Sequence, residues 1–258
     1  MDLVHPEYLP DPSLSRAEME SLQRDLAADA VFADDHGLDP AAVAVSEPVA
    51  DEADYDPAGG PVVAGIDQAF TDDECVTAVV AIQDGRVVER ATGRAPLDIP
   101  YIPGLLSFRE GNSIVNALES LDAPCDLLVV DGSGRVHFRQ AGLATHVGVM
   151  FDAPAIGVAK NLLCGAPEKS LDDFYAEGTR IAIEADGDVD ASADTVIGYA
   201  YQSRQYPNPE KRHVNPLVVS PGHRVSAETT VDFVEALCAG YKLPEPTRLA
   251  DSMAGRVK

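Results

Sequence analysis

The chain has 258 residues, 45% of them hydrophobic, which is enough to bury the core of one large globular domain. Its net charge of −24 arises from 43 acidic residues against 14 Arg and only 5 Lys, a balance that suits a halophilic cytoplasm where salt screens the repulsion. No apolar run approaches 18 residues and the four Cys are widely spaced, which excludes a membrane-spanning helix and a Cys-based zinc site.

The excess of acid is spread over the whole chain. An acidic tail on a neutral domain is the alternative, because residues 1–60 carry 15 acids and 2 Arg. The remaining residues still hold 28 acids and 17 bases, so the tail alone does not explain the charge. We therefore expect a soluble cytoplasmic protein, active as a monomer and not bound to a membrane.

The first 60 residues are predicted to form an acidic N-terminal helix and arm. Ser residues suited to capping precede apolar residues at helical spacing, which predicts a helix over residues 15–30. The following stretch is acidic and rich in Pro and Gly, as in a loosely packed arm or an extra edge segment. We place the domain boundary here, with a catalytic domain over residues 61–258.

Three strands are expected to open this domain. Residues 62–70 and 75–83 are apolar and rich in β-branched side chains, and residues 86–93 follow them after Asp84-Gly85. Asp-Gly between two apolar runs favours a two-residue hairpin, so the strands should be antiparallel.

Helices and strands then alternate. The periodicity predicts, in order, a helix over 107–121, a strand over 126–132, a helix over 141–150, a strand over 155–160 and a late helix over 226–240. This order predicts an α/β protein with a ribonuclease H-like fold. Its central mixed sheet would contain three antiparallel strands followed by parallel strands, flanked by helices.

Four carboxylates occur where they could share one site. Asp67 and Asp131 interrupt apolar strands, Glu110 opens a helix, and Asp251 lies near the C-terminus. A buried carboxylate is costly unless it is paired or binds a cation. We therefore expect a shared Mg²⁺, with Asp67 and Asp131 the firmest candidates because the fourth strand of such a fold packs beside the first. For Asp251, the alternative to metal binding is a role as a surface or helix-capping residue.

Four segments together resemble endonuclease V. They are residues 100–110 (PYIPGLLSFRE), 129–139 (VVDGSGRVHFR), 155–165 (AIGVAKNLLCG) and 222–226 (GHRVS). With Asp251 they span the chain from about residue 60 in the order of that family. The resemblance implies a Mg²⁺-dependent repair endonuclease, with Mn²⁺ as a possible substitute. Its substrate would be DNA, and in some members RNA, that contains deaminated adenine.

The resemblance also implies where the strand is cut and which acidic residues bind the metal. Cleavage would fall at the second phosphodiester bond 3′ to hypoxanthine, leaving a 3′-hydroxyl and a 5′-phosphate. Asp67, Glu110 and Asp131 match the metal ligands of the family, and Asp251 matches a position that holds Asp or His. Such a metal would lower the pKa of an attacking water and polarise the phosphate.

Lys160 and His137 match two further catalytic positions of the family. Lys160 ends an apolar strand and could contact the scissile phosphate, although a solvated strand end is the plain alternative. His137 could bind phosphate, shuttle a proton or orient Asp131. The family usually has Pro after this His, whereas here Phe138 follows, which frees one backbone angle and adds an N–H.

Two further features of the resemblance concern the base. The Pro100-Tyr101-Ile102-Pro103 segment matches the wedge that opens the duplex beside the lesion, with a structural turn as its alternative. Small and apolar residues match the pocket for the extruded base, although tight turns also use such residues. The expected pocket residues are Gly104, Gly134, Gly142, Gly157, Ala159 and Leu163.

Three alternatives stay open. The first is an inosine-specific endoribonuclease that acts on single-stranded RNA, and the second is a related nuclease that cuts RNA hybrids or flaps. The third is a non-catalytic binder of inosine-containing strands, which the presence of all four acids disfavours. Because an acidic surface repels nucleic acid, we expect binding through metal, backbone N–H groups, stacking and the base pocket, with Arg109, Arg139 and Arg224 as local contacts.

Overall fold

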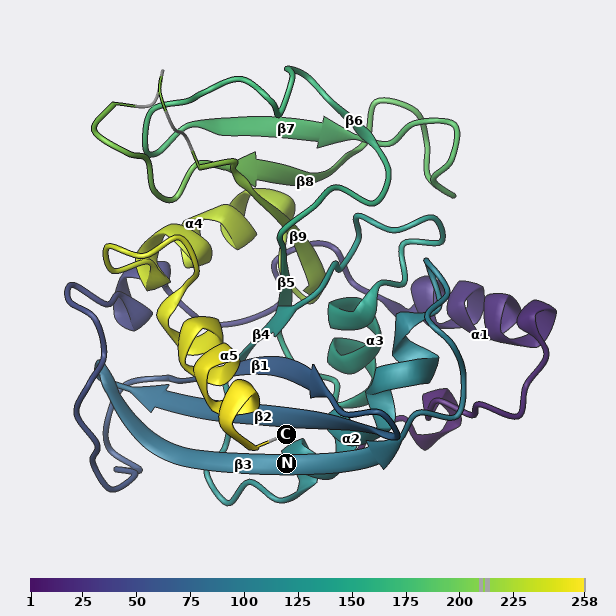
Figure 1. The fold of residues 1–258 in the computed structure, drawn as a ribbon, viewed down its shortest axis with the longest axis horizontal. Coiled ribbons are helices and arrows are strands. Elements are labelled where there is room, and N and C mark those ends of the chain that lie inside the picture. Colours follow the sequence, from purple (N-terminus) through teal and green to yellow (C-terminus); the bar gives the residue numbers. More distant parts are fainter. Residues whose placement is uncertain (209–210, 212–213, 258) are drawn as a thin grey trace.

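The protein is described by a computed structural model that covers residues 1–208, 211 and 214–257. Nine strands form one sheet in the order β3-β2-β1-β4-β5-β9-β8-β7-β6 (Figure 1). The strands are β1 (Val62–Phe70), β2 (Glu74–Gln83), β3 (Arg86–Pro96), β4 (Leu127–Asp131), β5 (Ala155–Ala159), β6 (Ala166–Pro167), β7 (Arg180–Glu184), β8 (Val196–Tyr201) and β9 (Leu217–His223).

The first five strands confirm the fold class expected from the sequence. β1, β2 and β3 are antiparallel, and β4 pairs in parallel with β1 and with β5. Asp84 and Gly85, both at positive φ, form the turn between β2 and β3. The result is a mixed sheet with helices on both faces, as in the ribonuclease H-like arrangement. The antiparallel strands β6 to β9 extend the sheet beyond β5 and had no counterpart in the sequence prediction.

In the part of the chain that the structure describes, five α-helices pack around the sheet (Figure 1). They are α1 (Arg16–Asp29), α2 (Leu106–Glu119), α3 (Leu143–Met150), α4 (Ala227–Leu237) and α5 (Glu245–Val257), with 3₁₀ turns at Pro6–Tyr8 and Pro40–Val43. α2 and α3 pack on one face of the sheet, and α5 packs on the other face against β1, β2 and β4. The two largest hydrophobic clusters lie on opposite faces of the sheet.

Strand alternation decides which face each acid occupies. Val63 in β1 and Val129 in β4 belong to the cluster under α4 and α5, whereas Ile66 belongs to the cluster under α2 and α3. Because side chains along a strand point alternately to the two faces, Asp67 and Asp131 lie on the face of α5. Both are at the carboxyl ends of their strands, close to the edge where α5 passes.

Gly65 sets how closely α5 approaches this face. A Cβ on Gly65 would lie 2.1 Å from the carbonyl carbon of Pro246, at the start of α5. Only a residue without a side chain allows the helix and strand backbones to meet this closely. The contact fixes the start of the helix that carries Asp251.

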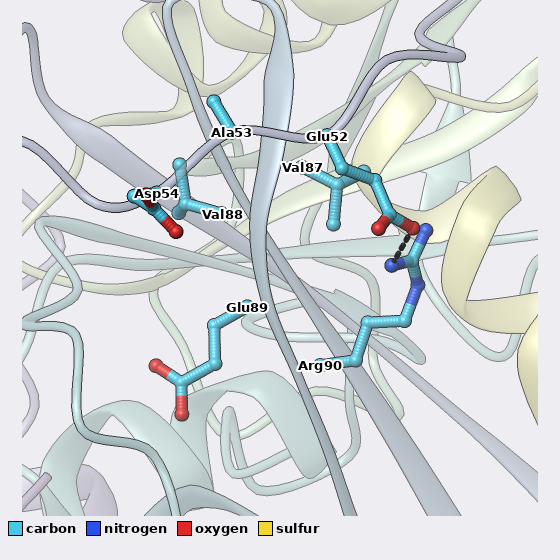
Figure 2. A pocket seen from close by; sticks show the side chains of 7 residues that line it. All are labelled: Glu52, Ala53, Asp54, Val87, Val88, Glu89 and Arg90. Atoms are coloured by element: carbon cyan, nitrogen blue, oxygen red, sulfur yellow. Dashed lines mark hydrogen bonds and ion pairs between the residues drawn. The ribbon is translucent and has the colours of Figure 1, made fainter.

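The N-terminal segment is joined to both sides of the domain. α1 begins with a capping box between Ser15 and Glu18, and its Leu26 is fully buried in the cluster beside α3. The arm then runs along the free edge of β3, where Ala53 donates to the carbonyl of Val87. Figure 2 shows this strip, in which the side chains of Glu52 and Arg90 form an ion pair. The arm therefore occupies an edge of the sheet.

Among the described residues, every helix is too short or too polar to cross a lipid bilayer.

Candidate active site

Three carboxylates from three elements come together at one edge of the sheet. Asp67 near the end of β1, Asp131 at the end of β4 and Asp251 in the second turn of α5 each offer an oxygen, and these oxygens lie within 4.8 Å of one another. Asp67 is 7% exposed, Asp131 is half-buried and Asp251 is exposed. The cluster is thus open to solvent on the side of α5.

Glu110 approaches from the opposite face. It lies in the second turn of α2 and is 7% exposed, but it is not one of the three residues whose oxygens lie within 4.8 Å of one another. Its carboxyl group still senses the cluster, because the charge of Asp131 helps to raise its pKa. Glu110 is therefore placed beside the three aspartates rather than among them.

The pKa values of two of these acids are raised by their surroundings. Burial raises the pKa of Asp67 to about 8, and the adjacent Asp131 adds to the effect by hydrogen bonding and by charge. Burial also raises the pKa of Glu110 to about 7, against the opposing charge of Arg109. Carboxyl groups held together at this cost become ionised when a divalent cation lies between them. The donor set, all carboxylate oxygen with a solvent-facing side, fits Mg²⁺ or Mn²⁺.

Lys160 places a positive charge beside the cluster. Its Nζ lies 3.0 Å from Oδ2 of Asp131 and 3.8 Å from Oδ1 of Asp251. Partial burial lowers the pKa of Lys160, but the surrounding aspartates outweigh that effect and raise it overall, so the ammonium stays charged. The side chain is half-exposed and follows β5 at the carboxyl end of the parallel strands. An ammonium in this position can meet a phosphate that approaches the acids.

Divalent cation binding is expected to strengthen as the pH rises from 6 to 8. In the cation-free protein Asp67 and Glu110 hold protons up to a pH of about 8 and about 7, and a bound cation must displace them. Each proton released makes the affinity about tenfold higher per pH unit below the pKa. Calorimetric titration with Mg²⁺ in buffers of different ionisation enthalpy counts these protons. A Glu119→Gln variant, changed at the exposed end of α2, is the control, and an affinity independent of pH would contradict the assignment.

His137 is buried and bonded to the backbone. Its Nδ1 lies 3.2 Å from the amide nitrogen of Arg139, so Nδ1 accepts, and Nε2 then donates to the carbonyl of Gly104 at 3.1 Å. Burial, with the charge of Arg139, lowers the pKa of His137 to about 4, so the ring is neutral at neutral pH. His137 is hydrogen-bonded to Gly104, directly after the Pro100–Pro103 segment, and to Arg139, but not to Asp131. The geometry therefore favours a structural role, in which His137 links these two backbone segments.

The wedge segment presents its aromatic residue to solvent. Tyr101 is 64% exposed, whereas Ile102 packs against the small apolar cluster of Met19, Leu105 and Phe108. The backbone turns at Gly104, whose φ is +81°, and α2 begins two residues later. An inward Ile and an outward Tyr leave the ring free for stacking on a base.

Three of the six expected pocket residues line one cavity. Gly104, Gly142 and Leu163 enclose a space of about 20 Å³ together with Gln23, Leu106, Ser107, Ser133, His137, Ala141 and Leu143. A cavity of this size holds about one water molecule, so the pocket is closed in this structure.

The other three expected pocket residues do not line this cavity. Gly134 and Gly157 allow close backbone packing, and Ala159 packs elsewhere. A Cβ on Gly157 would lie 2.5 Å from the carbonyl oxygen of Gly132, and one on Gly134 would lie 2.2 Å from that of Pro221. These glycines allow the loop after β4 to sit against β5 and β9, which positions the residues of that loop. Ala159 packs with the cluster around β7 and β8 instead.

Phe138 stands where the sequence resemblance leads us to expect Pro. Its ring packs beside Gly104, because a Cβ on that glycine would lie 3.0 Å from Cδ2 of Phe138. The backbone carbonyl of Phe138 accepts a hydrogen bond of 2.7 Å from Asp190. The aromatic ring and this bond hold the loop in place without a proline.

Gln23 was missed as a site residue by the sequence analysis. It lies on α1 between Met19 and Leu26, at helical spacing on the buried face, and is 1% exposed. A polar residue on an apolar helix face is the signal that could have drawn attention to it. Its neighbours in the fold, Gly104 and Ala141, are more than 80 residues away in sequence.

Comparison with known proteins points to one family. A family model described as Endonuclease V matches residues 44–252. The endonuclease V of Halobacterium salinarum is 61% identical over 260 residues, which is 98% of each chain. The endonuclease V structure from Streptomyces avermitilis is 30% identical, with a TM-score of 0.70, and the match covers 94% of this chain and 92% of that one.

A further solved structure has a similar fold with a nucleic acid bound. Endonuclease V of Ciona intestinalis, in complex with a 24mer DNA containing an inosine followed by a ribo-adenosine, is 23% identical with a TM-score of 0.69. That match covers 93% of this chain and 96% of the other. From the family model and the close relatives, this chain belongs to the endonuclease V family and is an endonuclease that acts on phosphodiester bonds.

Proposed function

We propose that this protein is a Mg²⁺-dependent repair endonuclease that recognises hypoxanthine in DNA and cuts the second phosphodiester bond on its 3′ side. The products would carry a 3′-hydroxyl and a 5′-phosphate. The observation that carries the proposal is the meeting of Asp67, Asp131 and Asp251 beside Lys160 at the carboxyl ends of parallel strands. The DNA in the Ciona intestinalis complex contains inosine, which supports the choice of substrate.

The metal ligands in this proposal are Asp67, Asp131 and Glu110, with Asp251 as a catalytic acid at the rim. Bound Mg²⁺, or Mn²⁺ in its place, would polarise the phosphate and lower the pKa of the attacking water. The carboxylates hold the negative charge that attracts the cation, and their burial on one side leaves the other side for substrate. Lys160 would donate hydrogen bonds to the scissile phosphate and balance the charge that develops on it.

Base recognition is assigned to the wedge and the cavity behind it. The Pro100–Pro103 segment would insert the exposed Tyr101 ring into the stack, so that the damaged base leaves the helix. The base would enter the cavity at Gly104, Gly142 and Leu163 after this cavity widens. Gly134, Gly157 and Ala159 would support the walls of the cavity. His137 would hold the backbone at Gly104, where the wedge segment ends.

The function is tested with three labelled substrates, of which the two DNA duplexes differ at one position. Duplex DNA with a single inosine, the same duplex with adenosine, and single-stranded RNA with a single inosine are incubated with Mg²⁺ in molar KCl. We expect the inosine DNA to be cut faster than the other two. Preferential cutting of the RNA would replace the proposal by an inosine-specific endoribonuclease, and equal cutting of inosine and adenosine DNA would refute base recognition.

Salt is expected to weaken binding less than it does for a basic DNA-binding protein. A protein that neutralises about 4 phosphates loses affinity with a slope near −4 in a plot of log K against log salt. With a net charge of −24, this protein has few basic side chains for such contacts. We therefore expect a slope of log K against log salt no steeper than about −2. Titration of KCl during binding of inosine DNA to the protein in Ca²⁺ measures this slope, and a slope near −4 or steeper would contradict the account.

We also propose that the protein acts as a cytoplasmic monomer, because its charge disfavours self-association.

A further inference from the structure

The carbonyl oxygen of Gly104 is the meeting point of three side chains. Gln23 Nε2 donates to it at 3.0 Å, His137 Nε2 at 3.1 Å and Arg139 Nη2 at 3.1 Å. Gly104 directly follows the Pro100–Pro103 segment and has a φ of +81°. Three donors on one buried carbonyl hold the end of the wedge segment in a single position.

Gln23 is the member of this group that comes from outside the catalytic domain. Besides Gly104, its Nε2 lies 3.4 Å from the carbonyl of Ala141, and its Oε1 accepts a bond of 2.7 Å from Nε of Arg139. Gly104 and Ala141 both line the closed cavity, as Gln23 itself does. The amide therefore ties two walls of the cavity together.

The rest of α1 supports the same segment by apolar contact. Met19 is buried with Leu105 and Phe108, and Ile102 of the wedge packs on that cluster. Met19 lies one helical turn before Gln23 on the same face of α1. The helix thus forms a platform under the wedge, with a polar attachment at Gly104 and an apolar one at Ile102.

We propose that Gln23 is a positioning residue of the nuclease, which fixes the wedge and the base cavity by linking α1 to the Gly104 carbonyl. This role rests on the proposed function of the wedge. In the absence of the amide donor, Gly104 and Ala141 lose a partner and the wedge segment becomes more mobile. The cost of ordering it then falls on substrate binding, so KM for inosine DNA rises while kcat changes little.

Two substitutions separate the donors from the shape of the side chain. Gln23→Glu keeps the size and the acceptor toward Arg139 but removes the NH₂ donors. Gln23→Met keeps an unbranched side chain of similar volume and removes every hydrogen bond, and it serves if a buried carboxylate prevents folding. Asp25→Asn, at an exposed position on the same helix, is the control.

The sequence contains no Trp, so Tyr101→Trp creates a single fluorescent reporter on the wedge. Time-resolved anisotropy is measured without nucleic acid in molar KCl, in this background and with each substitution added. We expect the amplitude of fast local motion to increase about twofold with Gln23→Glu and Gln23→Met and to stay unchanged with Asp25→Asn. Unchanged motion in a folded Gln23 variant would overturn the proposal.

Cleavage kinetics with Tyr101 in place give the second readout. We expect KM for inosine DNA to rise about fivefold to tenfold in both Gln23 variants, with kcat within about twofold. A fall in kcat at constant KM would overturn the positioning role. If the unchanged protein does not cut inosine DNA, the proposed function fails, whereas the anisotropy result still decides whether Gln23 holds the wedge.

Discussion

Replacement of Asp67 by Asn is expected to lower cleavage of inosine DNA about 10³-fold or more while making the cation-free protein more stable. Asn keeps the size of the side chain but cannot carry the charge that binds a cation, so the loss falls on the reaction. Stability rises because the fold of the unchanged protein keeps the buried Asp67 carboxyl group protonated beside Asp131 at a pH where the unfolded chain would ionise it, and Asn removes this cost.

The gain in stability should depend on pH. The pKa of Asp67 is about 8 in the folded protein and near its ordinary value of 3.8 when unfolded. Between these values the unfolded chain has lost a proton that the folded chain keeps, so the unchanged protein loses stability as the pH rises through this window. At pH 8 in chelator we expect the free energy of unfolding of Asp67→Asn to exceed that of the unchanged protein by several kcal/mol, and we expect a smaller difference at pH 5.

Thermal unfolding at pH 5 and pH 8, with chelator and molar KCl throughout, measures this effect. Asp122→Asn, at an exposed position just before β4, is the matched control and should leave both activity and stability unchanged. An Asp67→Asn protein that cuts as fast as the unchanged one would remove Asp67 from the metal site. A variant less stable than the unchanged protein at pH 8 would contradict the raised pKa.

Replacement of Gly65 by Ala is expected to destabilise the fold by about 3 kcal/mol and to reduce cleavage. The added Cβ would lie 2.1 Å from the carbonyl carbon of Pro246, so the start of α5 has to move away from β1. Backbone atoms on both sides leave no flexible side chain to absorb the clash. Because Asp251 is carried by α5, the same movement displaces it from Asp67 and Asp131.

Gly255→Ala is the control for this change. Gly255 lies in α5, and a methyl group added there would meet no described atom within 4 Å apart from its chain neighbours and the backbone of its own helix, so alanine should raise helix stability by about 0.5–1 kcal/mol. Thermal unfolding and cleavage of the two variants are compared in molar KCl. Equal unfolding temperatures for Gly65→Ala and Gly255→Ala would show that the contact between α5 and β1 does not limit stability.

The part of the fold that could be predicted from sequence is the part with strong local signals. β1, β2 and β4 are apolar and β-branched, and Asp84-Gly85 marks the hairpin, so three antiparallel strands followed by a parallel one could be expected. Asp67 and Asp131 stood out because a carboxylate inside an apolar run requires a partner. Their shared face then followed from strand alternation.

Most elements after β5 were not predicted, because their signals are weak; the exception is the helix expected over 226–240, which is observed as α4 (Ala227–Leu237). β6 has only two residues, β7 is a short apolar run between Arg180 and Glu184, and β8 is interrupted by Gly198. α5 begins among prolines and has few large apolar residues, so the helix that carries Asp251 was not expected, although Pro246 at its first turn is compatible with a helix start.

The closed cavity could be predicted only in part, because long-range contacts build it. Gly104, Gly142 and Leu163 line it, whereas Gln23 reaches it from a helix in the N-terminal segment. No periodicity relates residue 23 to residue 104. The division into an arm over residues 1–60 and a catalytic domain over 61–258 stays a prediction, and the contacts of Gln23 give the arm a place beside the site.

Cleavage of a 5′-labelled duplex with one inosine, in molar KCl with Mg²⁺ or with chelator, tests the central claim most directly. The proposed function predicts one product that ends one nucleotide beyond the inosine in Mg²⁺, and no product in chelator. A cut that forms equally in chelator, or one that falls without regard to the inosine, would contradict the account.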